Sequence, residues 1–140
     1  MRFMMLVKIP AKITEDEYGP DAETVAKMAK YNEELTKAGV LLALDGLHPP
    51  EKGARIEFAA DGKTTVTDGP FTEAKEIVGG YWIIDVRSKE EALEWVTRAP
   101  MGEGGVIELR QVAELSDFPA DVQEAAQLSE EPPEQTVARS

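Results

Sequence analysis

Four short segments of the chain have the length and the apolar content of β-strands. They are Phe3–Lys8, Val40–Leu44, Tyr81–Val86 and Val106–Val112. Apolar residues occupy both sides of Phe3–Lys8, which predicts a strand covered on both faces. In the third segment Trp82, Ile84 and Val86 alternate with Tyr81, Ile83 and Asp85, so the two sets are expected to face opposite layers.

Two segments with apolar residues at helical spacing separate these strands. Asp21–Ala38 is predicted to be a helix, with Asp21 as its N-cap and Gly39 as its stop. A second helix is expected to start at Ser88, because Ser88 and Glu91 match a capping box, and to end before Pro100.

A β-hairpin is predicted between the second and third strands. Asp61-Gly62 separates Ala54–Ala59 from Lys63–Thr67, and Asp-Gly between such segments is a strong hairpin signal. The order of elements is therefore that of an α+β protein, a ferredoxin-like βαββαβ fold with an inserted β-hairpin.

The predicted sheet has one face without helices, and that face carries Tyr81, Ile83 and an apolar side of the first strand. Such a surface is too apolar to remain exposed to water, and a second copy of the chain is the simplest partner that could bury it. We therefore expect a homodimer.

The amino-acid composition excludes several kinds of catalytic site, metal site and binding partner. The 140 residues include no cysteine and a single histidine, which excludes thiolate catalysis and a multi-histidine metal centre within one chain. The net charge of −12 argues against nucleic-acid binding. No apolar run is long enough to span a membrane, no signal peptide is recognisable, and no nucleotide fingerprint occurs. We expect a cytoplasmic protein without cofactor, metal, nucleic-acid or membrane partner.

Residues Thr67–Val86 carry the most specific pattern in the chain, with Asp68-Gly69-Pro70-Phe71 at its start. Glu73, Lys75-Glu76, the pair Gly79-Gly80 and an aromatic-led strand follow. This pattern resembles the YCII-related family, in particular its DGPF branch, over roughly Met1 to Val112. The resemblance implies a dimeric α/β-barrel of ferredoxin-like units, and it divides the chain into residues 1–112 and an acidic extension, residues 113–140.

Two residues are candidates for catalysis. The resemblance implies a His–Asp pair in an active-site cleft, and the matching positions here are His48 and Asp68. A histidine suits proton transfer near neutral pH, and His48 follows a strand on a proline-bounded loop. The alternatives are that His48 is an ordinary loop residue and that Asp68 only caps a short helix expected at Thr72–Glu76. Gly79-Gly80 is expected to allow a bulge or a close backbone approach.

Three cations are candidates for binding a small anionic ligand: Arg110, Lys75 and Arg55. Arg110 is expected on the helix-free face with Asp85 and Glu108, and an internal ion pair is its alternative. For Arg55 the alternative is an exposed position on the hairpin. For Lys75 the alternative is a local salt bridge or a solvated position.

Two functional hypotheses follow. The first is a cofactor-free acid/base enzyme, of lyase or isomerase type, that acts on a small carboxylated molecule in a dimer-associated cleft on the sheet face. The second is a ligand-binding or regulatory accessory protein, since the DGPF resemblance implies a link to sigma-factor-dependent transcription. In the extension, Ala120–Leu128 is expected to be a short helix, and Ser129–Ser140 a disordered acidic tail that could contact a protein partner.

Overall fold

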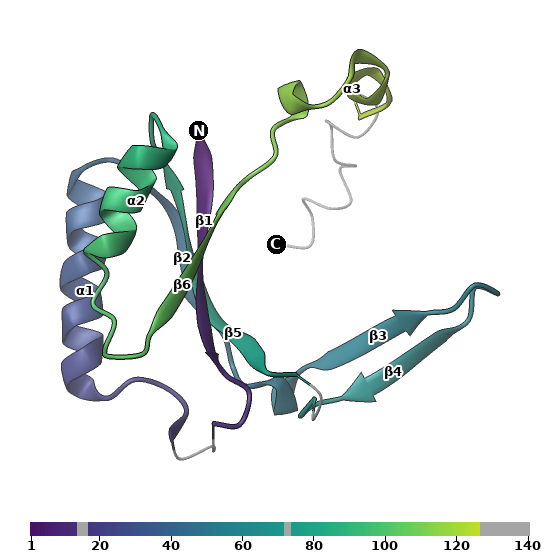
Figure 1. Cartoon of the computed structure of the whole chain (residues 1–140), viewed down its shortest axis with the longest axis horizontal. Coiled ribbons are helices and arrows are strands. Elements are labelled where there is room, and N and C mark those ends of the chain that lie inside the picture. The colour runs from purple at the N-terminus through teal and green to yellow at the C-terminus, as the bar shows by residue number, and fades with distance from the viewer. Residues whose placement is uncertain (14–16, 72–73, 127–140) are drawn as a thin grey trace, which may run out of the picture.

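The computed structural model describes residues 1–13, 17–71 and 74–126. A four-stranded antiparallel sheet forms its centre, with the strand order β2-β5-β1-β6. The strands are β1 (Arg2–Pro10), β2 (Leu41–Gly46), β5 (Glu76–Asp85) and β6 (Val106–Gln111). Helices α1 (Ala22–Lys37) and α2 (Lys89–Thr97) cover one face of this sheet (Figure 1). This strand order confirms the predicted ferredoxin-like α+β fold.

Both helices begin where the sequence predicts. The Asp21 carboxylate accepts a hydrogen bond from the Thr24 N–H at 2.8 Å, and this bond lowers the pKa of Asp21. The Ser88 hydroxyl accepts one from the Glu91 N–H at 3.1 Å. The Glu91 carboxylate accepts a hydrogen bond from the N–H of Arg87 rather than from that of Ser88, so only half of the expected capping box is formed.

The core lies between the sheet and the two helices, and three aromatic residues fill its middle. Tyr31 of α1 meets Trp82 of β5 edge to face, with 5.6 Å between ring centroids, and it lies 6.5 Å from Trp95 of α2. The Tyr31 hydroxyl donates to the Trp95 carbonyl oxygen at 2.6 Å. Burial of the phenol raises the pKa of Tyr31 to about 12. These contacts fix α1 and α2 on the same face of the sheet.

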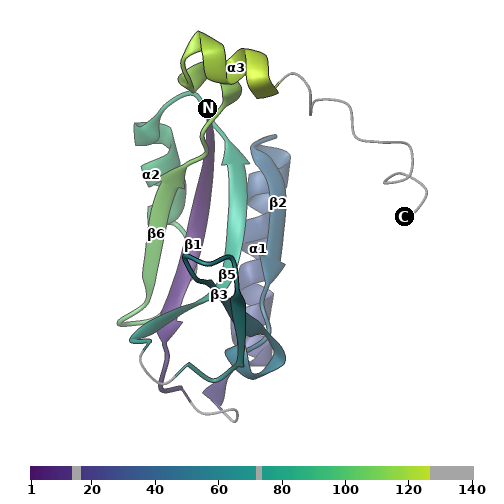
Figure 2. The ribbon, with the colours of Figure 1, turned by 90° about the vertical axis from the view of Figure 1, so that its right-hand side faces the viewer.

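In the described part of the chain no helix packs on the opposite face of the sheet, which is turned toward the viewer in Figure 2, partly behind the β-hairpin. Cross-strand pairing places Ile83 beside Met4, and Tyr81 beside Leu6. Residues 108 and 110 of β6 join this face opposite Leu6 and Met4. The side-chain alternation expected for Tyr81–Val86 is therefore confirmed. We call this surface the open sheet face.

Two extensions lie on the side of the open sheet face (Figure 1). One is the predicted hairpin, a two-stranded arm of β3 (Ala54–Phe58) and β4 (Thr64–Asp68). The other consists of a 3-10 turn, η3 (Leu115–Asp117), and helix α3 (Ala120–Ala126). Helix α3 agrees with the predicted one as far as residue 126; positions 127 and 128 and the predicted tail Ser129–Ser140 lie outside the described residues.

Strand β5 begins earlier than the sequence suggested. The helix predicted at Thr72–Glu76 is wrong in its described part, because residues 74 and 75 are not helical and Glu76 already belongs to β5. Residues 72 and 73 lie outside the described residues. Pairing with β1 explains the difference, since Glu76 and Ile77 align with Pro10 and Ile9 at the end of that strand. Tertiary strand pairing overrides the local helix signal here.

The glycine pair lies within β5 and behaves as expected. The register with β1 shifts between Val7 and Lys8, which leaves Gly79 as the extra residue of a β-bulge. A Cβ on Gly80 would lie 3.0 Å from the Asp45 carbonyl oxygen of β2. The bulge and the close approach bring the ends of β1, β2 and β5 together, where the candidate site is found.

Candidate functional site

A pocket of about 630 Å³ lies at one end of the sheet, between the sheet and α1. This volume falls within the usual range for small-molecule sites. Most of its wall is apolar: Val7, Ile9, Ile13, Met28, Leu44, Leu47 and Trp82 contribute to it. Its polar lining residues include His48, Tyr18, Asn32, Asp45 and Glu17. We call this cavity the α1–sheet pocket.

His48, the only histidine of the chain, reaches the pocket from the loop after β2. The residue before it is held from two sides. The Leu47 N–H donates to the Gly79 carbonyl oxygen at 3.0 Å, and the Leu47 carbonyl oxygen accepts from the Tyr18 hydroxyl at 2.5 Å. The 3-10 turn η2 (Pro50–Lys52) follows directly, preceded by Pro49. The loop that carries His48 is therefore anchored at both ends.

Trp82 and Asn32 form the inner wall. The indole N–H of Trp82 donates to the Asn32 side-chain oxygen at 2.7 Å, which ties β5 to α1. Trp82 is 5% exposed, so one ring serves both the core and the pocket. A polar residue in the apolar stripe of α1 is the sequence signal for this contact, and Asn32 was not among the predicted site residues.

Asp45 and Tyr81 also adjoin the pocket, but their side chains pair on the open sheet face. They lie opposite each other across β2 and β5, while their neighbours Leu44 and Trp82 face α1. The Tyr81 hydroxyl donates to an Asp45 carboxylate oxygen at 2.8 Å, and this bond raises the pKa of Tyr81. The carboxylate of Asp45 is thus engaged on the other face of the sheet.

Asp68 is the last residue of β4 and pairs with Ala54 of β3. Gly69 then passes so close to η2 that a Cβ at this position would lie 2.0 Å from the Pro50 carbonyl oxygen. The segments that carry His48 and Asp68 are therefore packed together. Within the described residues, however, no hydrogen bond or ion pair joins these two side chains, and Asp68 does not line the α1–sheet pocket.

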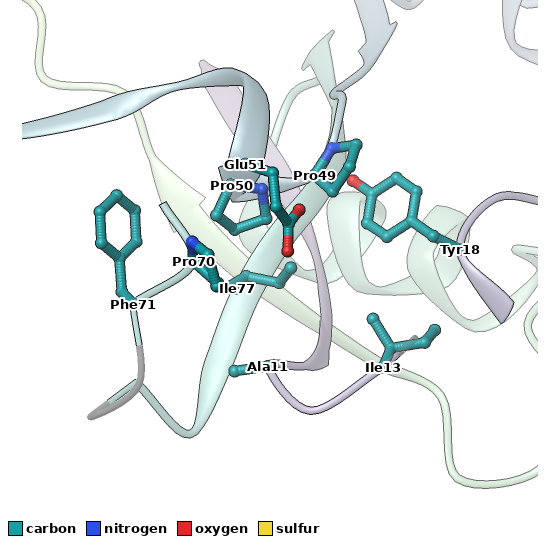
Figure 3. A pocket seen from close by; sticks show the side chains of 9 residues that line it. All are labelled: Ala11, Ile13, Tyr18, Pro49, Pro50, Glu51, Pro70, Phe71 and Ile77. Carbon is teal, nitrogen blue, oxygen red and sulfur yellow. The ribbon is translucent and has the colours of Figure 1, made fainter. Parts of the chain in front are cut away.

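A smaller cavity of about 20 Å³, enough for roughly one water molecule, lies where these segments meet. Figure 3 shows Pro49, Pro50 and Glu51 between Tyr18 on one side and Pro70 and Phe71 on the other. Burial raises the pKa of Tyr18, and the nearby charge of Glu51 adds to the effect. The Asp-Gly-Pro-Phe segment thus supports the outer side of the His48 loop.

The three expected anion-binding cations all lie outside the α1–sheet pocket. Arg110 forms an ion pair with Glu108 at 3.6 Å on the open sheet face, which was its alternative interpretation. Arg55 places its guanidinium 4.2 Å from the centre of the Phe71 ring. Lys75 is exposed just before β5, where its carbonyl oxygen accepts from the Ala11 N–H.

The described residues offer few other sites. No group of three or more histidine, aspartate or glutamate side chains within them has the arrangement of a metal site. In the same part of the chain no helix has the length and apolar character needed to cross a membrane. The α1–sheet pocket is therefore the cavity on which a functional argument can be built.

The fold and this pocket define a ferredoxin-like α+β protein with a ligand-sized cavity between helix and sheet. The family model of the YCII-related domain matches residues 1–116, and the chain belongs to this family. An uncharacterised protein of Rhizobium meliloti (strain 1021) is 33% identical over 75 residues. These residues make up 54% of this chain and 60% of that relative.

Proposed function

We propose that this YCII-related protein binds a small organic molecule in the α1–sheet pocket and carries out cofactor-free acid/base chemistry on it. The observation that carries the proposal is the position of His48. The chain's only histidine lines a pocket of ligand size whose wall is otherwise mainly apolar. An imidazole changes its charge close to neutral pH, which suits a group that both accepts and returns a proton.

The reaction class follows from what one imidazole can do. His48 accepts a proton from a carbon next to a carbonyl group and becomes an imidazolium. The carbonyl group stabilises the resulting carbanion as an enolate. Its electron pair then either expels a leaving group from the neighbouring carbon, which departs with the proton of the imidazolium, or takes that proton back at another position of the enolate. The first route is an elimination and the second an isomerisation, in keeping with a lyase or isomerase. Neither route requires an oxidant or a metal ion.

Asp68 has a less direct part in this proposal. The family resemblance pairs it with His48, and the packing of Gly69 against Pro50 brings its segment to the His48 loop. Its carboxylate is exposed and outside the pocket lining. We therefore assign proton transfer to His48 and leave the orientation of His48 by Asp68 as a prediction.

The proposal is tested by nuclear magnetic resonance, because a single histidine gives one unambiguous set of imidazole signals. Small carbonyl compounds are screened for those that shift the His48 signals, and the compounds that do so are assayed for turnover. His48→Gln is expected to lower turnover by at least about 100-fold, since it removes the proton carrier. Lys52→Gln, on η2 and outside the pocket lining, serves as the control. Undiminished turnover by His48→Gln would contradict the proposal.

Asp68→Asn belongs in the same assay. It keeps the shape of the side chain and removes its charge, so a loss of turnover shared with His48→Gln would support the pairing of the two residues. Activity equal to that of the unmodified protein would limit Asp68 to a structural part at the end of β4.

We further propose that the protein is a homodimer formed through the open sheet face, in the manner of a dimeric α/β-barrel. Met4, Leu6, Tyr81 and Ile83 make this face apolar, and the β3–β4 arm and α3 lie on the same side (Figure 1). The arm adds exposed apolar residues: Phe58 is 81% exposed and Val66 is 64% exposed. A two-fold dimer would give both surfaces a partner at once.

Light scattering on a size-exclusion column tests the dimer. The unmodified chain is expected to elute with the mass of two chains, and Ile83→Lys with that of one, because a lysine would be buried without a partner at the centre of the interface. Val25→Lys, on the exposed side of α1, is the matched control and should remain dimeric. A single-chain mass for the unmodified protein would overturn this proposal.

A further inference from the structure

The charged residues that line the α1–sheet pocket limit the ligands it can take. Glu17 and Asp45 are acidic, but the Asp45 carboxylate pairs with Tyr81 on the open sheet face. His48 is the remaining ionisable group apart from the two tyrosines. Among the described residues no lysine or arginine contributes to the wall. Arg110 and Arg55, the arginines expected to hold a carboxylate, are engaged with Glu108 and Phe71 elsewhere.

An anionic group inside this pocket would therefore lack a lysine or arginine partner. Taking a carboxylate out of water is costly unless an opposite charge or several hydrogen-bond donors replace the water. Two hydrogen-bond donors in the pocket wall already donate to other groups of the protein. The Trp82 N–H donates to Asn32, and the Tyr18 hydroxyl donates to the Leu47 carbonyl oxygen.

The rest of the wall favours a flat or bulky apolar molecule. Trp82 and Tyr18 present aromatic surface, and Met28, Leu44 and Ile9 present aliphatic surface. Burial of apolar area against such a wall contributes favourably to binding in proportion to the area removed from water. His48 is the polar group through which a ligand's hydroxyl or carbonyl could be oriented.

We infer that the α1–sheet pocket takes an uncharged, largely apolar molecule with one hydrogen-bonding group directed at His48, and that it discriminates against carboxylates. This inference rests on the proposed binding function of the same pocket and specifies its ligand class. It departs from the carboxylated ligand that the sequence led us to expect, because the cations behind that expectation lie outside the pocket.

Three probes that share one ring system test the inference: 2-naphthalenemethanol, 2-naphthylmethylamine and 2-naphthoate, titrated into the unmodified full chain at pH 7.5. Isothermal calorimetry gives the affinities, and the His48 imidazole signals report the site. The alcohol is expected to bind at least about tenfold more tightly than the carboxylate, and more tightly than the amine. A carboxylate that binds within threefold of the alcohol, or an amine that binds more tightly than the alcohol, would overturn the inference.

A pair of variants on β2 tests whether the weak binding of the carboxylate arises in the α1–sheet pocket. Leu44 lines the pocket, whereas Leu42, two residues earlier on the same strand, does not, and both are partly exposed, at 37% and 52%. Leu44→Lys is expected to raise the affinity for 2-naphthoate about tenfold, because it supplies the missing cation. Leu42→Lys is expected to leave that affinity unchanged. An equal gain in both variants would show a general charge effect and would contradict the inference.

The two proposals fail in different ways. If no probe binds, the inferred ligand class is wrong, and the His48→Gln turnover assay still decides the proposed chemistry. If the alcohol binds in the expected order but His48→Gln retains turnover of a shifted compound, the ligand class stands and the role of His48 in catalysis is wrong.

Discussion

Gly69→Ala is expected to destabilise the protein by about 3 kcal/mol, at the upper end of the usual cost of overpacking. A Cβ at this position would lie 2.0 Å from the carbonyl oxygen of Pro50 and 2.3 Å from its carbonyl carbon. Both atoms belong to the backbone of η2, so no side chain can rotate to make room. The chain must move at one of the two segments, and η2 follows the His48 loop directly.

Urea unfolding followed by circular dichroism measures this effect, and the imidazole signals of His48 report the accompanying shift of its loop. Gly46→Ala is the control. It lies at the end of β2, and a Cβ there would meet no atom within 4 Å. We expect the control to change the free energy of unfolding by less than about 0.5 kcal/mol. Equal unfolding midpoints for the two variants would refute the close packing of Gly69 on Pro50.

Trp82→Ala is expected to cost about 3–5 kcal/mol of folding free energy. The side chain is 5% exposed, meets the Tyr31 ring edge to face and donates its N–H to Asn32. Truncation would leave a cavity between β5 and α1, continuous with the α1–sheet pocket. The same variant should therefore also lose affinity for 2-naphthalenemethanol under conditions in which it remains folded.

Trp82→Phe separates the ring from its N–H. It retains most of the apolar area and leaves the Asn32 side-chain oxygen without its donor, so a smaller loss of about 1–2 kcal/mol is expected. Urea unfolding by far-ultraviolet circular dichroism suits both variants, because it does not depend on indole fluorescence. Val66→Ala, on the exposed arm, should lie within about 0.5 kcal/mol of the unmodified protein. A Trp82→Ala variant as stable as Val66→Ala would exclude Trp82 from the core.

Much of the fold could be predicted because its signals are local. Asp21 and Ser88 cap helices where a side-chain oxygen near the start of an apolar stripe predicts a cap. The alternation of Trp82 and Ile84 with Tyr81 and Ile83 assigns each to a face of the sheet. The start of β5 could not be predicted in this way, since Glu76 and Ile77 are held by pairing with β1, some seventy residues earlier.

The site was predictable only in part. His48 and the Asp-Gly-Pro-Phe segment were recognised from the sequence, and the structure packs their segments together through Gly69 and Pro50. The cations expected to bind the ligand were chosen for their chemistry alone. Their partners, Glu108 for Arg110 and Phe71 for Arg55, depend on strand register and on the path of a loop.

The amino-acid sequence alone is enough to identify the ferredoxin-like order of helices and strands, the YCII-related family and the single histidine available for proton transfer. These features follow from residue type and short-range spacing, which do not depend on the tertiary structure. The position of His48 and the residues around it depend instead on the three-dimensional fold. Its pocket is assembled from α1 and from the ends of β1, β2 and β5, which long-range strand pairing and the bulge at Gly79 bring together.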